Sequence, residues 1–265
     1  MKTWQMIIPI LFLVLFKAVS VQAVSNQPIH WGFNKGTNEQ QAEAGTEYDQ
    51  LLNKYGAFYK GNKDEKILYL TFDNGYENGY TGKILDILKK EKVPAAFFVT
   101  GHYLKTAPDL AKRMVKEGHI IGNHSWSHPD MTQISEEKIK IELAKVKDET
   151  KIITGQADMM YLRPPRGILS ERSMKIAQEE GYVHVLWSLA FKDWLTNQQK
   201  GWKYSYDSIM AQVHPGSVML LHTVSKDNAD ALERVIQELK KRGYTFKSLD
   251  DYMLKEKVKS PLIFD

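Results

Sequence analysis

The sequence lacks cysteine entirely, and its other scarcities are also informative. Without a cysteine in 265 residues, the chain can form no disulfide scaffold, no thiolate-ligated metal site and no thiol nucleophile. Its 17 glycines and 9 prolines are too few for a collagen-like or low-complexity chain, and 11% aromatic residues argue against wholesale disorder. A net charge of only +4 gives no support to nucleic-acid binding. The composition is that of a globular protein.

The first 23 residues are predicted to be a secretory signal peptide (1–23) and not part of the fold. Lys2 precedes an uncharged apolar run over 6–16, and small residues end the segment at Ala23. This run is about half the ~20 residues that a transmembrane helix needs. We therefore expect an exported protein, secreted or associated with the cell envelope, that meets the membrane only through this segment. An uncleaved membrane anchor is the alternative.

The remaining chain divides into an N-terminal extension (24–65), a main domain (66–255) and a C-terminal tail (256–265). Apolar runs that do not alternate with polar residues are interleaved with amphipathic patterns, which indicates parallel strands covered by helices. The number of such units favours an α/β fold of the (β/α) barrel type. The predicted strands are 67–72, 95–100, 119–122, a segment near 161, 183–188, 217–222 and 245–247. The predicted helices are 41–55, 81–92, 108–117, 135–152, 170–180, 206–213, 227–242 and a terminal one.

Charged and imidazole side chains collect where the predicted strands end. They are Asp73, the pair His124 and His128, the pair Arg163 and Arg166, Asp193, and His222. In a β/α barrel the carboxyl ends of the strands meet at one face, so these side chains should share a site. Each also has an ordinary interpretation, such as a turn cap or a solvated surface group. The His-x-x-x-His spacing, however, can turn two imidazoles the same way, as a divalent metal site needs.

Five motifs in order along residues 66–250 resemble those of the NodB-type polysaccharide deacetylases, carbohydrate esterase family 4. The motifs are TFDNG (71–75), HSWSH (124–128), RPPRG (163–167), DW (193–194) and LLH (220–222). The longer stretch TFDNGYENGYT (71–81) is similar to one branch of that family. This branch is the peptidoglycan N-acetylmuramic acid deacetylases of spore-forming bacilli. The resemblance implies a distorted (β/α) barrel with an N-terminal extension.

The resemblance also implies roles for individual residues. Asp73 would be the general base and His222 the general acid, with Asp193 orienting His222 and Arg163 keeping Asp73 ionised. A divalent metal would be bound by His124, His128 and Asn74. The residues implied to contact the sugar are Tyr76, Trp126, Trp194, Arg166 and Leu220. The other histidines (His30, His102, His119, His184 and His214) are interpreted as structural.

Two positions depart from the family pattern. Asn74 stands where the family has a second aspartate as metal ligand, so we expect a weakly bound cation: zinc, manganese, magnesium or cobalt. Arg166 stands where the family usually has an aromatic residue. A guanidinium there suits a carboxylate, and N-acetylmuramic acid carries a lactyl carboxylate once its peptide is removed.

The resemblance predicts hydrolysis of the N-acetyl group of N-acetylmuramic acid in peptidoglycan. The product is the free amine needed for muramic δ-lactam in the spore cortex, which implies a role in sporulation and germination. The partner would be a glycan strand already stripped of peptide by an amidase, and we expect a monomer. Two alternatives stay open. One is deacetylation of N-acetylglucosamine in peptidoglycan or chitin oligomers, and the other is a non-catalytic glycan-binding domain.

Overall fold

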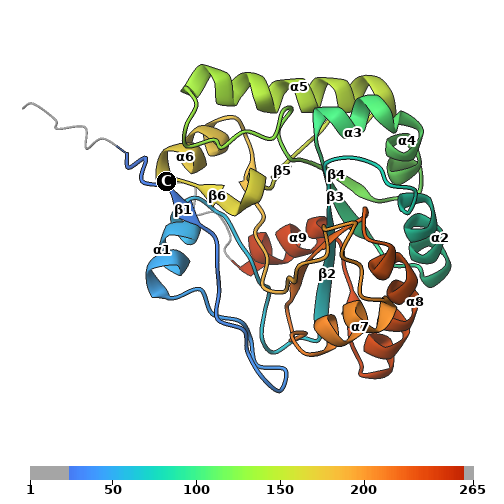
Figure 1. The fold of residues 1–265 in the computed structure, drawn as a ribbon. Coiled ribbons are helices and arrows are strands. Elements are labelled where there is room, and N and C mark those ends of the chain that lie inside the picture. The colour runs from blue at the N-terminus through green and yellow to red at the C-terminus, as the bar shows by residue number, and fades with distance from the viewer. Residues whose placement is uncertain (1–23, 260–265) are drawn as a thin grey trace, which may run out of the picture.

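The computed structural model describes residues 24–259, so the predicted signal peptide and residues 260–265 of the predicted tail lie outside the described residues. A parallel sheet forms the centre, and helices pack around it (Figure 1). Its strands are β2 (Ile67–Asn74), β3 (Ala95–Val99), β4 (Ile120–Asn123), β5 (Tyr161–Leu162), β7 (Val183–His184), β8 (Val218–His222) and β9 (Thr245–Phe246). No helix within residues 24–259 is long and apolar enough to cross a membrane.

The sheet curls round towards a barrel. Its strand order is β7-β5-β4-β3-β2-β8, each neighbouring pair is parallel, and β9 pairs with the start of β2. An isolated bridge between Leu189 and Met219 then joins the segment after β7 to β8, at the other end of that order. This confirms the prediction of an α/β fold with a distorted parallel barrel.

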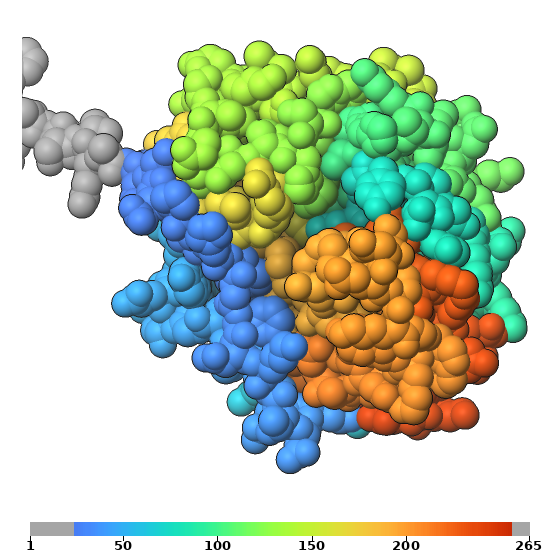
Figure 2. All heavy atoms as spheres, in the orientation of Figure 1, coloured from blue at the N-terminus to red at the C-terminus, as the bar shows by residue number. Residues whose placement is uncertain are grey.

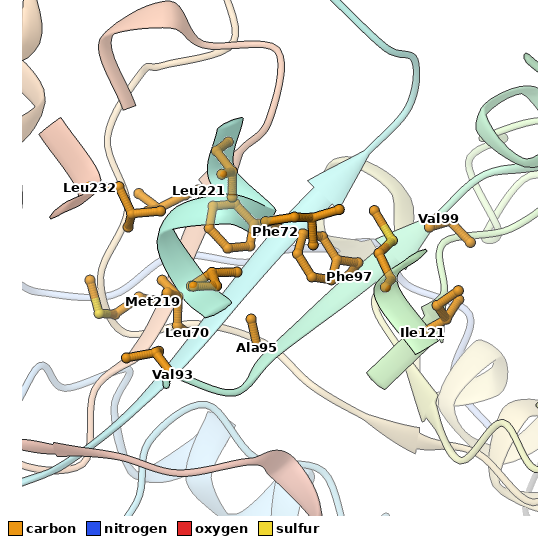
Figure 3. Packing of buried hydrophobic residues seen from close by; sticks show 14 of the residues in the cluster. Leu70, Phe72, Val93, Ala95, Phe97, Val99, Ile121, Met219, Leu221 and Leu232 are labelled. Atoms are coloured by element: carbon orange, nitrogen blue, oxygen red, sulfur yellow. The ribbon is translucent and has the colours of Figure 1, made fainter. Parts of the chain in front are cut away.

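Side chains of the strands point alternately out to the helices and into the barrel. Leu70 and Phe72 of β2 pack outward with Phe97 of β3 and Leu221 of β8, in the layer beneath the helices (Figure 3). Inside the barrel, Tyr69 packs in a separate cluster with residues of the other strands. The same alternation on β2 therefore sends Asp73 inward, at the carboxyl end of the strand.

The helices lie close to their predicted positions, with three differences, the first being that the helix predicted over 41–55 begins only at Thr46. They are α1 (Thr46–Lys54), α2 (Thr81–Glu91), α3 (Gly101–Thr106), α4 (Pro108–Lys116), α5 (Glu136–Thr154), α6 (Glu171–Glu179), α7 (Trp202–Met210), α8 (Lys226–Lys241) and α9 (Leu249–Lys259). The prediction did not include α3, which has only six residues and begins at a glycine. It placed α7 at 206–213, whereas the helix runs from Trp202 to Met210, directly after two residues, Lys200 and Gly201, whose backbone N–H groups donate to Asp227.

The segment from 24 to 65 packs along the barrel, as the surface of Figure 2 shows in blue. Its strand β1 (Ile29–His30) pairs antiparallel with β6 (Ile168–Leu169), and Phe58 bridges Val185 just after β7. The sequence predicted neither short strand. It also predicted one strand over 183–188, whereas β7 ends at His184 because the chain then turns to bridge first Phe58 and later Met219.

Candidate active site

A cavity of about 690 Å³ opens at the carboxyl ends of the strands. This volume lies within the ~300–1,000 Å³ range of small-ligand sites. Most of the predicted site residues line it: Asp73, Tyr76, His124, Trp126, His128, Arg166, Trp194, Leu220 and His222. Arg163 and Asp193 are buried and contact this lining from behind. The structure thus brings together residues that lie far apart in the sequence.

Asp73 is held by a buried arginine. Arg163 has no exposed surface, and its Nη1 donates to Asp73 Oδ1 at 2.9 Å and to Thr71 Oγ1 at 2.8 Å. Arg163 Nε donates to the carbonyl of Val185, which fixes the guanidinium. Burial by itself would raise the pKa of Asp73, but the charges of Arg163, His124 and His222 lower it overall. Asp73 is therefore an ionised carboxylate at neutral pH, ready to accept a proton.

His222 faces a different carboxylate. Its Nδ1 lies 2.7 Å from Asp193 Oδ1, and its backbone N–H donates to Asp193 Oδ2 at 2.8 Å. Asn228 Nδ2 donates to the same Oδ2 at 2.5 Å, so Asp193 is fixed on both oxygens. Burial would lower the pKa of His222, but the charge and hydrogen bond of Asp193 and the charge of Asp73 raise it overall. His222 can therefore hold a proton on the ring nitrogen that Asp193 leaves free.

His124 and His128 lie on a tight turn after β4. The turn places Ser125 and His128 at φ of 64° and 58°, the left-handed region that non-glycine residues rarely adopt. Glu142 of α5, almost fully buried, accepts both the backbone N–H (2.7 Å) and the hydroxyl (2.8 Å) of Ser127. The imidazole rings lie 4.9 Å apart between centroids. A strained turn, pinned from α5, thus gives the two rings a fixed separation.

The two imidazoles are neutral at neutral pH. Burial lowers the pKa of His124, and burial also lowers that of His128, to about 4. His124 Nδ1 lies 2.8 Å from the carbonyl of Arg163, so this nitrogen carries the hydrogen. His124 Nε2 then carries a free lone pair, and this nitrogen lies 3.5 Å from Asp73 Oδ2. A backbone carbonyl that fixes one nitrogen and leaves the other free is the usual arrangement of a metal-binding histidine.

Arg166 and two aromatic side chains form the more exposed part of the lining. Arg166 sits at φ 58° in the short turn Pro165–Gly167, just after β5. Its side chain has no hydrogen-bond or ion-pair partner among the described residues. Tyr76 and Trp194 are 43% and 45% exposed, and the Trp194 ring lies 5.4 Å from that of His222. These side chains are accessible to a ligand in the cavity.

The cavity is also lined by His102, which the sequence analysis interpreted as structural, and by Trp187, which it did not name. His102 follows β3 by only three residues, so the same search for polar groups beyond strand ends could have found it. Trp187 fell within a strand predicted to run over 183–188, so no loop signal marked it. Glu142 and Asn228 carry no local signal, because each acts through a contact with a distant segment.

Comparison with known proteins agrees with this geometry. The family model described as polysaccharide deacetylase matches residues 60–185. The peptidoglycan-N-acetylmuramic acid deacetylase PdaA of Bacillus subtilis is 54% identical over 92% of this chain and 93% of its own length. This chain belongs to the polysaccharide deacetylase family.

Two further comparisons give the similarity of this polysaccharide deacetylase to other members of the family. The solved structure of B. subtilis PdaA, described as a family 4 carbohydrate esterase, superposes with a TM-score of 0.87 at 56% identity. It covers 88% of this chain and 100% of the PdaA chain. A peptidoglycan-N-acetylglucosamine deacetylase of Bacillus cereus is 34% identical over 75% of this chain and 72% of its own.

Deacetylases of this family generally depend on a metal, and the site offers part of a ligand set. Within residues 24–259, no group of three or more His, Cys, Asp and Glu side chains is placed to hold a metal. Asn74 is the remaining predicted ligand. Its Nδ2 donates to Thr223 Oγ1 at 2.8 Å, whereas its buried Oδ1 has no hydrogen-bond partner there. The cavity lining therefore offers a cation the imidazoles of His124 and His128, whereas Asn74 is not among the described residues that line the cavity and stays a predicted ligand.

Proposed function

We propose that this protein removes the acetyl group from N-acetylmuramic acid residues of peptidoglycan whose peptide has been removed. The observation that carries the proposal is the pair of opposed carboxylates: Asp73 is kept ionised by Arg163, while Asp193 favours the protonated form of His222. Amide hydrolysis needs both a proton acceptor and a proton donor at one site. The identity to PdaA, named for N-acetylmuramic acid, supports the choice of sugar.

In the proposed reaction, Asp73 takes a proton from a water molecule, which attacks the acetyl carbonyl carbon. The tetrahedral intermediate collapses as His222 gives its proton to the departing amine nitrogen. The products are acetate and the free amine of the muramic residue. A divalent cation at His124, His128 and Asn74, when bound, would supply Lewis-acid polarisation of the carbonyl. We propose that its affinity is low because Asn74 brings no charge.

We propose that Arg166 determines the specificity for N-acetylmuramic acid over N-acetylglucosamine. Its guanidinium lines the cavity without an ion-pair partner among the described residues. A lactyl carboxylate on the reacting sugar would pair with it, whereas N-acetylglucosamine has no such group. The amine released next to that carboxylate is the one a muramic δ-lactam requires. The substrate is in the cell wall, so we propose an exported protein that acts on it as a monomer.

Mass spectrometry of peptidoglycan fragments tests the proposal. Purified protein should remove acetyl from the muramic residues of peptide-free strands and leave strands that carry peptide unchanged. Arg166→Ala should lower the rate on peptide-free muramic strands about tenfold, with little change on chitin oligomers. Acetate released only from N-acetylglucosamine residues would contradict the proposed substrate. Equal losses on the two substrates would contradict the role of Arg166.

A further inference from the structure

Two lysines from different helices lie over the ring of Trp126, a residue that lines the cavity. The Nζ atom of Lys105 on α3 is 4.8 Å from the ring centroid, and that of Lys145 on α5 is 5.9 Å from it. Helices α3 and α5 pack side by side there (Figure 1). Neither ammonium group has a carboxylate or hydrogen-bond partner in the part of the chain that the structure describes. Two ammonium groups near one ring, neither of them in an ion pair, would attract an anion.

The position of Trp126 is fixed by the fold. The backbone N–H of Gly101, the first residue of α3, donates to the Trp126 carbonyl at 3.0 Å. A Cβ atom on Gly101 would lie only 2.3 Å from the indole ring, so the ring packs directly on the helix backbone. Lys105 lies one helical turn after Gly101 and therefore on the same face of α3. The lysines thus converge on an anchored ring that lines the cavity.

The charge of the cavity wall also suits an acidic ligand. Asp73 is the sole carboxylate that lines the cavity among the described residues, and Arg163 already pairs with it. His102 and Arg166 add further basic side chains to the lining. Arg166 comes from the turn after β5, a different segment from the one that carries Trp126. The two lysines therefore form a second basic group, separate from the arginine proposed for the reacting sugar.

We infer that Lys105, Lys145 and Trp126 form a subsite for a second lactyl carboxylate of the glycan strand. This inference rests on the proposed function, because a peptide-free strand carries such a carboxylate on every muramic residue. The ammonium groups would pair with the carboxylate, while the anchored indole ring holds the apolar stems of the two lysines in place. A peptide on that residue would turn the carboxylate into an amide and remove the ion pair. The enzyme would then favour strands with at least two neighbouring peptide-free muramic residues.

Calorimetric binding tests the subsite, in an Asp73→Asn background so that the glycan is not consumed. The test variant is Lys105→Met with Lys145→Met, which keeps the apolar stems against Trp126 and removes both charges. The control is Lys116→Met with Lys151→Met, because these lysines are exposed and have no ion-pair partner among the described residues. The ligands are peptide-free oligosaccharides with one or two muramic residues, each also prepared with its carboxylates reduced to alcohols.

The test variant should bind the two-muramic ligand about tenfold more weakly than its parent, because each lost ion pair should weaken binding about threefold. The control variant should bind this ligand as tightly as the parent does. On the reduced ligands the test variant and its parent should bind equally. An unchanged affinity for the two-muramic ligand overturns the subsite, and so does an equal loss on the reduced ligand. Acetate release by the unsubstituted protein is measured in parallel. Its absence would overturn the proposed function, and the affinity difference would still decide the subsite.

Discussion

Two buried aspartates at the same cavity have opposite kinds of partner. Asp73 faces Arg163, which cannot give up its proton, whereas Asp193 faces His222, which can. The first pair favours the ionised carboxylate, and the second favours the protonated imidazole. Environments that push two titrating groups towards opposite states are what acid–base catalysis at neutral pH requires. The difference between the two sides of the cavity thus assigns the proton acceptor and the proton donor.

Asp73→Asn should have the largest effect, because an amide cannot accept the proton. We expect acetate release to fall about 10³-fold on peptide-free strands. The substitution also leaves the buried Arg163 charge unpaired, which costs about 3–5 kcal/mol of folding free energy. Thermal unfolding followed by circular dichroism should therefore accompany the rate measurement. A folded variant that retains more than a tenth of the activity would show that Asp73 is not the base.

Asp193→Asn removes the carboxylate that holds the proton donor His222, and it should lower turnover about 100-fold. The pKa of His222 is raised overall, so its proton is present at low pH and is lost as the pH rises through that pKa. Without the Asp193 charge, burial lowers this pKa. The alkaline limb of the kcat profile should then move to lower pH, while the acid limb set by Asp73 stays in place. An unmoved alkaline limb would separate Asp193 from the protonation of His222.

The chemical groups of the site were predictable from the sequence. They follow the ends of predicted strands, and successive side chains of a strand point to opposite faces, so every second one points inward. Asp73, His222 and Leu220 follow that rule directly. The supports of the site were not predictable. Glu142 lies 15 residues after Ser127 and Asn228 lies 35 after Asp193, so only packing brings them together. The same holds for Asp227, which accepts the backbone N–H of Lys200, 27 residues earlier in the sequence.

Asn74→Asp sharpens the comparison by adding a charge beside Asp73 while leaving the Asp193 pair intact. An anionic oxygen at this position should tighten binding of a divalent cation about tenfold. Calorimetry with zinc or manganese measures this directly, and Asn53→Asp on α1 is a control with the same added charge far from the cavity. Equal affinities of the Asn74→Asp variant and the unsubstituted protein would show that residue 74 is not a ligand.

Trp194→Ala should have the smallest effect, since it touches the Asp193 side without altering its charges. The Trp194 ring lies against His222 yet is 45% exposed, which suits a surface on which a sugar ring stacks. Loss of that contact should raise KM about three- to tenfold on peptide-free strands, while the pH profile of kcat keeps its shape. Trp202→Ala is the matched control, because this tryptophan is similarly exposed but packs on α8 against Arg234. A shift of the alkaline limb of the kcat profile in Trp194→Ala would mean instead that the indole shields the Asp193–His222 pair from water. The protonation of His222 would then depend on the indole as well as on the Asp193 carboxylate.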